Sequence, residues 1–405
     1  MTDPLSSLTD PAAALAVPSF TAAEIAAVDL DAVRAKFAAN RQIIATRCLE
    51  RGDVLHGANV ALLGGEHVLL LGPPGTAKSY VARTWAGQFC VTYGEAMLTR
   101  QTAESDVFAY VDIPAMIAGR SVKRYEGKVT ACQIAFVDEI FKGPQLLNSC
   151  LAWLNERIVP GPGALRSPLL SCIAASNECA EDDTVAAFDD RLLVRFWVDR
   201  IADRATRASL LTDAGANHGS AQGLTLQPIS YLEILAAQTA VRSLTLDDVA
   251  ANGLLDIQDA LGQAGVYTSD RRTKAAARLL RAHAWLDGAA QVEVDHLDFL
   301  RNVLWRRPDD RPTVDAAIGA VNRGIIGEIR AGVERVLAWY GEQKARADFP
   351  SRAWEVASHI RAETIQLTSN WKDKVPERLK DRANGYFAEL KTAFEEAKGL
   401  TEVAR

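Results

Sequence analysis

The sequence lacks the usual features of membrane, secreted and zinc-binding proteins. No apolar run approaches the roughly 18 residues that a membrane-spanning helix needs, and residues 1–4 hold no basic side chain of the kind that begins a signal peptide. The six cysteines include no Cys-x-x-Cys pair, and the six histidines are scattered singly. We therefore expect a cytoplasmic protein with no membrane span, no disulfide framework and no zinc site.

An excess of positive charge is also missing. The 405 residues include 45 lysines and arginines against 51 aspartates and glutamates, which gives a net charge of −6. No stripe of basic residues with interleaved aromatics is present, so a nucleic-acid partner is not expected. Apolar residues make up 48% of the chain, which is enough for a core in each of two or three domains of ordinary size.

The stretch from residue 68 to residue 80 carries the strongest functional pattern. Residues 68–71 are four apolar residues in a row, which predicts a strand buried on both faces. Val81, Trp85 and Phe89 recur every four residues, which predicts a helix with one apolar stripe. A strand, a loop and a helix in this order form the context that a phosphate-binding P-loop needs. The predicted loop consists of Gly72, Pro73, Pro74, Gly75, Thr76, Ala77, Lys78 and Ser79, and Tyr80 follows it among the expected nucleotide contacts.

Each part of this loop has an expected role with ATP and Mg²⁺. Backbone N–H groups and the helix N-terminus would hold the phosphates, Lys78 would reach the β- and γ-phosphates, and the Ser79 hydroxyl would bind Mg²⁺. Ala77 replaces the usual second glycine. We expect it to have helical φ and ψ angles, which suit alanine. The alternative is a glycine-rich turn that happens to precede Lys-Ser.

Two further strands are expected to end beside the loop. Residues 134–137 are apolar and lead into Asp138 and Glu139. At the carboxyl end of a parallel strand, Asp138 would complete the Mg²⁺ site, and Glu139 would orient and deprotonate the attacking water. Residues 170–175 lead into Asn177, whose amide would hydrogen-bond the water or the γ-phosphate. Solvated acids after a strand and an ordinary Ser-Asn turn are the alternatives.

Two arginines are candidates for sensing or completing a nucleotide site. Arg191 lies just before the predicted strand 194–198, from where it would reach the γ-phosphate of a neighbouring subunit, and Arg195 is the second choice. A surface salt bridge is the alternative. Arg271, with Arg272 as second choice, begins a predicted helix and would contact the nucleotide of its own subunit. The alternative there is a solvated helix end with Asp270 as its N-cap.

The order of predicted elements indicates an α/β fold. Short apolar strands alternate with helices up to about residue 200, which predicts a parallel sheet covered by helices. Strands then disappear, and helices are expected at 231–241, 247–261, 269–286 and 294–305. We expect a flexible leader at 1–20, a nucleotide-binding domain at 21–200 and an all-α lid at 201–308. A helical C-terminal extension would follow at 309–405, with a linker at 308–312 and further helices around 325–339, 354–367 and 379–398.

These motifs, in this order, resemble the AAA+ superfamily over about residues 40–308, and within it the MoxR family, most closely the RavA-like branch. The resemblance rests on the P-loop with its Ala-Lys-Ser ending and on residues 136–140, 151–157, 175–178, 190–195 and 269–272. It implies an ATPase that forms a homo-oligomer, with a hexameric ring as the family form and ATP bound between subunits. It also implies two insertions facing the ring, which here would lie at about 104–116 and 157–168. The latter has a Pro-Gly-Pro-Gly turn that suits a hairpin.

The resemblance implies a chaperone-like remodeller of a protein client, often partnered with a von Willebrand factor A domain protein. RavA-like proteins carry a β-rich module in their helical extension, and we expect none in this tail. Two other functions stay open: a nucleotide-gated adaptor whose hydrolysis only resets partner binding, and, with less support, a DNA or RNA motor. The helical tail could serve docking or simply support the lid.

Overall fold

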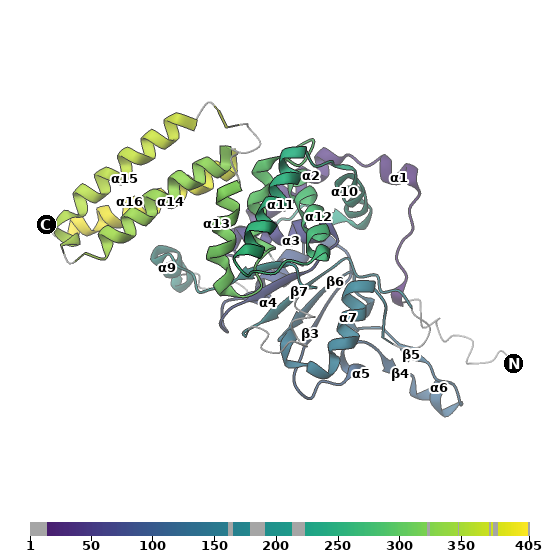
Figure 1. Cartoon of the computed structure of the whole chain (residues 1–405). Coiled ribbons are helices and arrows are strands. Elements are labelled where there is room, and N and C mark those ends of the chain that lie inside the picture. The colour runs from purple at the N-terminus through teal and green to yellow at the C-terminus, as the bar shows by residue number, and fades with distance from the viewer. Residues whose placement is uncertain are drawn as a thin grey trace. The chain divides into compact units, whose positions relative to one another are not determined.

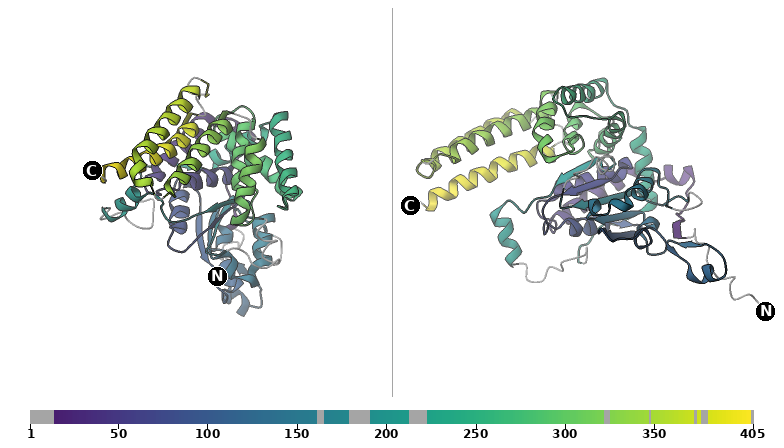
Figure 2. Two further views of the ribbon diagram at one scale, coloured as in Figure 1. Left: turned by 60° about the vertical axis from the view of Figure 1, so that its left-hand side comes forward. Right: turned by 60° about the horizontal axis from the view of Figure 1, so that its bottom comes forward.

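The computed structural model describes residues 14–160, 165–178, 191–212, 223–321, 325–346, 348–371, 374–375 and 380–403 (Figures 1 and 2). By its contacts the chain forms two compact units. The first comprises Met1–Leu244, Thr268–Leu286 and Asn302–Asp310, and the second comprises Thr245–Tyr267, Asp287–Arg301 and Arg311–Arg405. None of the helices in the described ranges has both the length and the apolar character that crossing a membrane requires.

A five-stranded parallel sheet forms the centre of the first unit. Its strands lie in the order β3 (Tyr93–Met97), β6 (Ile134–Asp138), β7 (Ser171–Ser176), β1 (Val68–Leu71) and β8 (Val194–Trp197). The predicted strands at 68–71, 134–137, 170–175 and 194–198 are confirmed to within one residue at each end. β3 was not predicted, because its sequence, Tyr-Gly-Glu-Ala-Met, contains no run of apolar residues and its side chains are half-buried or exposed. The parallel sheet among helices confirms the predicted fold class.

Helices surround this sheet in the first unit. α3 contacts β1, β7 and β8, while α4 contacts β6 and β7. The helices are α1 (Ala22–Ala26), α2 (Leu30–Ala45), α3 (Gly52–Gly64), α4 (Lys78–Ala86), α5 (Glu104–Val107), α6 (Ile113–Ile117), α7 (Leu147–Glu156), α9 (Arg204–Thr212), α10 (Tyr231–Ser243) and α12 (Asp270–Leu286).

The apolar repeat at Val81, Trp85 and Phe89 is only partly helical. α4 ends at Ala86, and Phe89 instead begins the short strand β2 (Phe89–Cys90), which pairs with β9 (Ile229–Ser230). The rings of Trp85 and Phe89 nevertheless pack edge to face, with centroids 5.1 Å apart.

Two long connections between strands of the sheet, which we call excursions, lie near the predicted insertions. The first contains α5 and α6 together with an antiparallel pair, β4 (Tyr110–Val111) and β5 (Lys123–Arg124). The second is a hairpin in which Ile158 bridges Arg166, and the tip at 161–164 lies outside the described residues. A small core of Leu15, Ala109, Tyr125 and Val159 joins the bases of both excursions to the start of the described chain.

Apart from one isolated β-bridge between Leu246 and Val292, the regular secondary structure of the second unit's described residues is helical. Its helices are α11 (Asp248–Gln263), η5 (Val294–Asn302), α13 (Arg311–Val321), α14 (Ile325–Lys344), α15 (Phe349–Trp371) and α16 (Lys380–Val403). The predicted helix at 294–305 is instead a run of 3₁₀ turns, η5. The predicted linker at 308–312 is helical too: η6 (Pro308–Asp310) is followed by α13, whose first turn accommodates Pro312.

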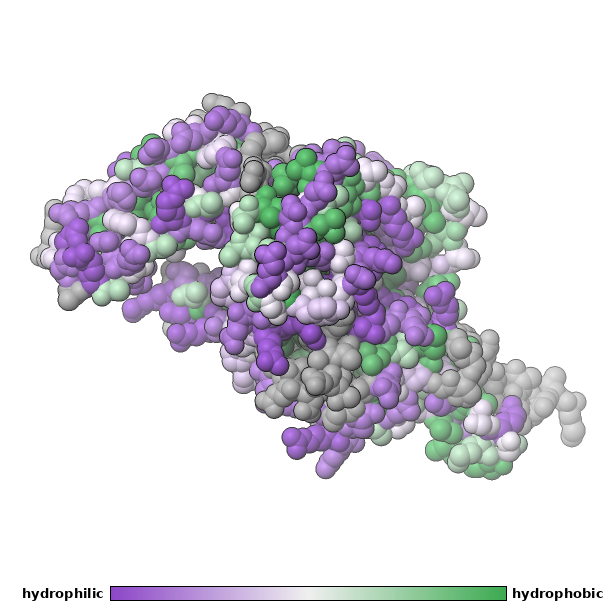
Figure 3. Space-filling model, viewed as in Figure 1, coloured by the Kyte–Doolittle hydropathy of each residue, from purple (hydrophilic) through white to green (hydrophobic). Residues whose placement is uncertain are grey.

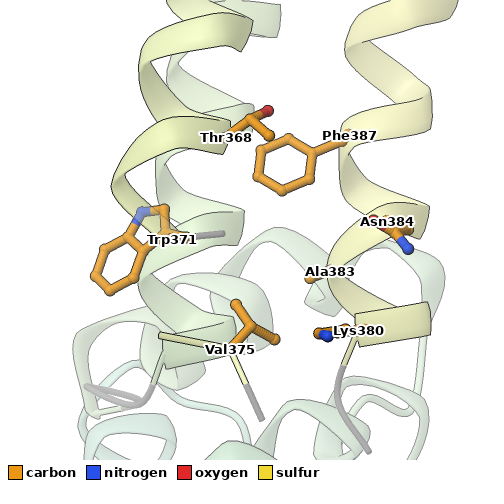
Figure 4. Close-up of a pocket in the computed structure, with 7 residues that line it drawn as sticks. All are labelled: Thr368, Trp371, Val375, Lys380, Ala383, Asn384 and Phe387. Atoms are coloured by element: carbon orange, nitrogen blue, oxygen red, sulfur yellow. The ribbon is translucent and has the colours of Figure 1, made fainter. Parts of the chain in front are cut away.

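The last three helices pack together around their own core. Buried aliphatic residues of α14, α15 and α16, among them Val333, Ile360 and Leu390, fill its centre. Where α15 ends and α16 begins, a cavity of about 330 Å³ is lined by Thr368, Trp371, Val375, Lys380, Ala383, Asn384 and Phe387 (Figure 4). The tail is therefore a packed helical bundle.

Candidate functional site

Three parallel strands deliver the predicted site residues to one edge of the sheet. β1 leads into Gly72, β6 ends at Asp138 with Glu139 next in the chain, and Asn177 follows β7. Because the carboxyl ends of parallel strands lie at the same edge, residues far apart in the sequence meet there. The loop 72–77 lies between β1 and α4, as the P-loop prediction requires.

Lys78 is the central cation of this edge. Its side chain is buried, and Nζ donates hydrogen bonds to the carbonyl oxygens of Gly72 (2.7 Å) and Pro73 (3.0 Å) and to Oδ1 of Asn177 (2.8 Å). Burial lowers the pKa of Lys78, while the nearby carboxylates of Asp138 and Glu139 act to raise it. The three oxygens that it contacts are acceptors of the kind that a phosphate would also offer.

The loop backbone takes conformations that glycine favours. Gly72 has φ +145° and Gly75 has φ +80°. A Cβ atom on Gly72 would lie 2.1 Å from the carbonyl oxygen of Val198, so no other residue fits there. Thr76 closes the loop by donating from Oγ1 to the Pro73 carbonyl oxygen at 3.0 Å.

The expectation for Ala77 is wrong. Instead of helical angles it has φ +66° and ψ +26°, which is the left-handed region, and it stands at the N-cap of α4. The loop geometry therefore demands a positive φ at the position where the usual pattern has glycine, and alanine adopts it at a cost of roughly 1–2 kcal/mol. Its small side chain makes this possible, whereas a β-branched residue would be a severe outlier there.

Glu139 and Asn177 are joined directly. Asn177 Nδ2 donates to Glu139 Oε1 at 2.6 Å, and Lys142 Nζ lies 3.0 Å from the same oxygen. Glu139 is buried, and its other oxygen, Oε2, accepts no hydrogen bond from the residues that the structure describes. Its backbone is left-handed (φ +54°), an uncommon conformation that aims a side chain at the cost of strain. A buried carboxylate oxygen without a donor is a good acceptor for a water molecule.

The same edge of the sheet also holds the remaining predicted site residues, Asp138, Ser79 and Tyr80. Asp138 Oδ1 accepts a hydrogen bond of 2.9 Å from the backbone N–H of Glu139. Burial raises the pKa of Asp138, and the charge of Glu139 raises it further. Ser79 and Tyr80 are half-buried in the first turn of α4. The Ser79 hydroxyl and the Asp138 carboxylate are hard oxygen donors, the type of ligand that Mg²⁺ prefers.

Arg191 lies away from this edge. It precedes β8, whose Val194 N–H donates to the His67 carbonyl oxygen at 3.1 Å, just before β1 begins. Arg191 thus lies near the amino-terminal edge of the sheet, opposite the loop. Arg195 is fully buried and donates to the carbonyl oxygens of Leu192 (2.9 Å) and Arg306 (3.1 Å), so it holds the fold together from inside. The nearby Asp189 and Asp190 lie outside the described residues.

Arg271 also lies at the amino-terminal edge, so the structure does not bring it to the P-loop of its own subunit. It is exposed, and its Nη2 donates to Oδ1 of Asn155 at 2.6 Å. Just beyond Asn155, Arg157 donates to the carbonyl oxygens of Gly65 (3.1 Å) and Leu170 (3.2 Å), which precede β1 and β7. The four residues of β1, about 13 Å of strand, separate that edge from the P-loop.

The start of α12 differs from the prediction in two smaller ways. Ser269, and not Asp270, provides the capping side chain, since its Oγ accepts from the Arg272 backbone N–H at 3.2 Å. Arg272 itself is buried, with Nη1 donating to the carbonyl oxygen of Val303 at 3.0 Å. Arg271 is thus the member of the pair that is available at the surface.

Two polar contacts of these sites were missed in the sequence. Lys142 pairs with Glu139, and Asn155 holds Arg271. Lys142 follows Glu139 by three residues, the spacing of one helical turn, so its proximity could have been inferred. Asn155 offered no such signal, because its contact with Arg271 depends on where α12 packs.

Comparisons with known proteins agree with the fold. A family model described as the MoxR domain in the MoxR-vWA-beta-propeller ternary systems matches residues 35–238, and a model of an AAA lid domain matches residues 250–318. Two proteins of Methanocaldococcus jannaschii are similar to this chain. Uncharacterized protein MJ0079 is 32% identical over 65% of this chain and 68% of its own length. Uncharacterized protein MJ0812 is 30% identical over 69% of this chain and 74% of its own length.

The crystal structure of a candidate ATPase from Cytophaga hutchinsonii superposes with a TM-score of 0.55. The superposition covers 73% of this chain and 96% of the Cytophaga hutchinsonii chain. At 14% sequence identity, this likeness shows a shared fold.

Proposed function

Because the chain belongs to the MoxR family of AAA+ ATPases, we propose that it binds and hydrolyses ATP at the carboxyl edge of its sheet. The observation that carries the proposal is the buried Glu139, whose Oε2 accepts no hydrogen bond within the described part of the chain and whose Oε1 is held by Asn177. Such a carboxylate is positioned to accept a proton from an attacking water.

Each residue of the site has a proposed role. The loop from Gly72 to Ala77 and the start of α4 bind the phosphates, and Lys78 neutralises their charge. Ser79 and Asp138 would hold Mg²⁺, which supplies charge stabilisation for the transferring phosphoryl group. Tyr80, in the same turn of α4, would contact the nucleotide.

Glu139 receives the proton of the water, and Asn177 fixes the orientation of that carboxylate. Asn177 also contacts Lys78, so one amide links the base to the phosphate-binding cation. Because asparagine is neutral, it provides this link without reducing the attraction of the site for Mg²⁺.

We further propose a ring, with six subunits as the family form, in which Arg191 completes a neighbour's site. Arg191 lies near the amino-terminal edge of the sheet, away from its own P-loop, as a residue acting between subunits would. Arg271, held by Asn155 at the same edge, would by the same argument act on a neighbour and not on its own nucleotide. Light scattering tests the ring: a monomer at micromolar concentrations with ATP would contradict it.

The proposed task is remodelling of a protein client, with a von Willebrand factor A domain protein as the proposed partner. The name of the matching family model, which refers to MoxR-vWA systems, supports this partner. The finer placement in the RavA-like branch is also a proposal, and it rests on the sequence motifs alone. In the alternative function, a nucleotide-gated adaptor, ATP bound at the same site would control partner binding, and hydrolysis would only reset it.

The test of the proposed function is Glu139→Gln. We expect ATP binding within a few-fold of the unmodified chain and hydrolysis slower by at least about 100-fold, since general-base catalysis contributes about 10²–10⁴-fold. Lys78→Ala, which removes the phosphate-binding cation, should lose ATP binding. Glu342→Gln, an exposed change on α14, should alter neither. Full hydrolysis in Glu139→Gln would refute the assignment.

A further inference from the structure

An exposed apolar tip lies at the end of the first excursion. On α6, Ile117 is 81% exposed, Ile113 61% and Met116 57%, and on β4 Tyr110 and Val111 are 40% and 45% exposed. The region of α6 forms a green patch at the lower right of Figure 3. So many large apolar side chains on so short a segment are unusual for a surface without a binding role.

Hydrogen bonds hold the tip in place, so its exposure does not come from a frayed end of α6. Asp112 caps α6 by accepting from the Ala115 backbone N–H at 2.9 Å, and its other oxygen accepts from Arg124 Nε at 2.7 Å. Both Asp112 and Ala115 are buried. Gly119, at φ +77°, then turns the chain back towards β5. The apolar side chains are therefore held outward by capped and paired groups beneath them.

The charges around the tip are mostly positive. The acids Asp112 and Glu126 both face Arg124, at 2.7 Å and 3.7 Å. No ion pair within 4 Å joins Arg120, Lys123 or Lys128 to an acid in the described ranges, although Arg120 lies near enough to Asp112 to help lower the pKa of that carboxyl. Lys123 and Lys128 each donate to a carbonyl oxygen, that of Pro160 at 3.4 Å and that of Asp106 at 2.9 Å, and Lys128 Nζ also lies 5.7 Å from the centre of the Tyr110 ring. The apolar tip is thus flanked by cations that remain available to an anionic partner.

We propose that this tip binds an amphipathic segment of a partner protein, one with an apolar face and acidic residues beside it. Ile113, Met116 and Ile117 are spaced i, i+3 and i+4, so they form a single ridge that suits the apolar stripe of one helix. Acidic side chains on that helix would meet Arg120, Lys123 and Lys128. The inference deepens the proposed function and rests on it, since the segment would belong to the protein on which the ring acts.

Two other occupants are outcomes of the test. An anionic membrane would also attract cations around an apolar tip, so vesicle binding is measured beside peptide binding. A second copy joined tip to tip would bring its cations face to face. The acidic amphipathic segment satisfies both the apolar ridge and the charged residues beside it.

The test measures binding of two synthetic helical peptides of about five turns. One has leucine on one face and glutamate on the other, and in the second lysine replaces every glutamate. Fluorescence anisotropy compares the full chain with Ile113→Ser/Met116→Ser and with Val249→Ser/Ile365→Ser. The control residues are 64% and 60% exposed on the second unit, so the control loses comparable exposed apolar surface elsewhere.

We expect the Leu/Glu peptide to bind the full chain and the control variant equally and the tip variant at least about tenfold more weakly. Added salt should weaken this binding, and the Leu/Lys peptide should not bind. Equal binding of both peptides, or equal binding by the tip variant, would overturn the proposal. So would binding only to vesicles of phosphatidylcholine and phosphatidylglycerol. Basal ATP hydrolysis, measured on every variant, should not change, which separates this proposal from the ATPase assignment.

Discussion

The side chains of Asn177 and Glu139 are joined by a hydrogen bond of 2.6 Å, although the two residues follow different strands and stand 38 positions apart. The same asparagine accepts a hydrogen bond of 2.8 Å from Lys78. Its amide therefore fixes the distance between the proposed general base and the phosphate-binding cation. Neither partner could shift without breaking a contact at a partly buried position.

This geometry predicts separate effects of two substitutions at Asn177. Asn177→Ala should slow ATP hydrolysis by about 10–100-fold with little change in ATP affinity, because it releases the Glu139 carboxylate but leaves Lys78 in place. Asn177→Asp should reduce hydrolysis more, since it sets a second carboxylate against Glu139. Single-turnover kinetics with a separate binding measurement distinguish these effects. Unchanged turnover in Asn177→Ala would mean that the amide does not position the base.

A second prediction concerns the backbone at Ala77. Since φ is +66° there, Ala77→Gly should raise the free energy of unfolding by up to about 1 kcal/mol and preserve ATP binding. The same substitution at Ala38, exposed within α2, should lower it by about 1 kcal/mol. Ala77→Val should weaken ATP binding severely, because β-branched residues avoid positive φ. Chemical denaturation and nucleotide titration provide the measurements. A change in the free energy of unfolding that has the same sign for Ala77→Gly and Ala38→Gly would contradict the prediction.

The sequence predicted those parts of the fold whose signal is local. The predicted strands β1, β6, β7 and β8 are largely apolar, although Arg195 interrupts β8, and all four are almost wholly buried. β3 was missed because Gly94 and Glu95 interrupt its sequence, so this strand at the edge of the sheet carries no comparable run. The convergence of Lys78, Glu139 and Asn177 was also predictable, since it follows from parallel strands ending at one edge.

What the sequence did not predict depends on long-range packing or on exact backbone angles. The local pattern suggested helical angles at Ala77, but closure of the loop against β1 decided its positive φ. Arg271 was expected beside its own nucleotide because it begins a helix. Its actual neighbour, Asn155, is set by the packing of α12 against α3, which no local pattern reports.

A third prediction concerns the helical tail. Arg330, buried on α14, donates to Asp298 at 2.8 Å, and Tyr386 of α16 donates to the other Asp298 oxygen at 2.9 Å. Arg330→Met should destabilise the second unit by up to about 3 kcal/mol, because it breaks a buried ion pair while Arg301, 3.1 Å from the same oxygen of Asp298, still partly compensates that carboxylate. Arg335→Met, at an exposed position of the same helix, should change stability by less than about 0.5 kcal/mol. Hydrogen exchange of the α14 and α16 amides would show the difference, and equal protection in both variants would contradict it.

The fourth prediction tests whether Arg191 acts between subunits. Arg191→Ala should reduce hydrolysis about 10³-fold or more if the guanidinium stabilises the transition state. Lys78→Ala should also be inactive, because it cannot bind ATP. When the two inactive variants are mixed, some interfaces pair an intact P-loop from the Arg191→Ala subunit with an intact Arg191 from the Lys78→Ala subunit. Such mixtures should therefore regain hydrolysis, with most activity near equal proportions.

The same mixing experiment separates the two arginines at the amino-terminal edge. If Arg271 also acts on a neighbour, Arg271→Ala mixed with Lys78→Ala should regain activity in the same way. If it acts on its own nucleotide, that mixture should stay inactive, since each subunit then lacks one essential residue. Arg195→Ala should not be rescued by mixing, because Arg195 is fully buried and bonded within its own subunit. A mixture of Arg191→Ala and Lys78→Ala that stays inactive, while both variants still co-assemble, would place Arg191 outside any shared site.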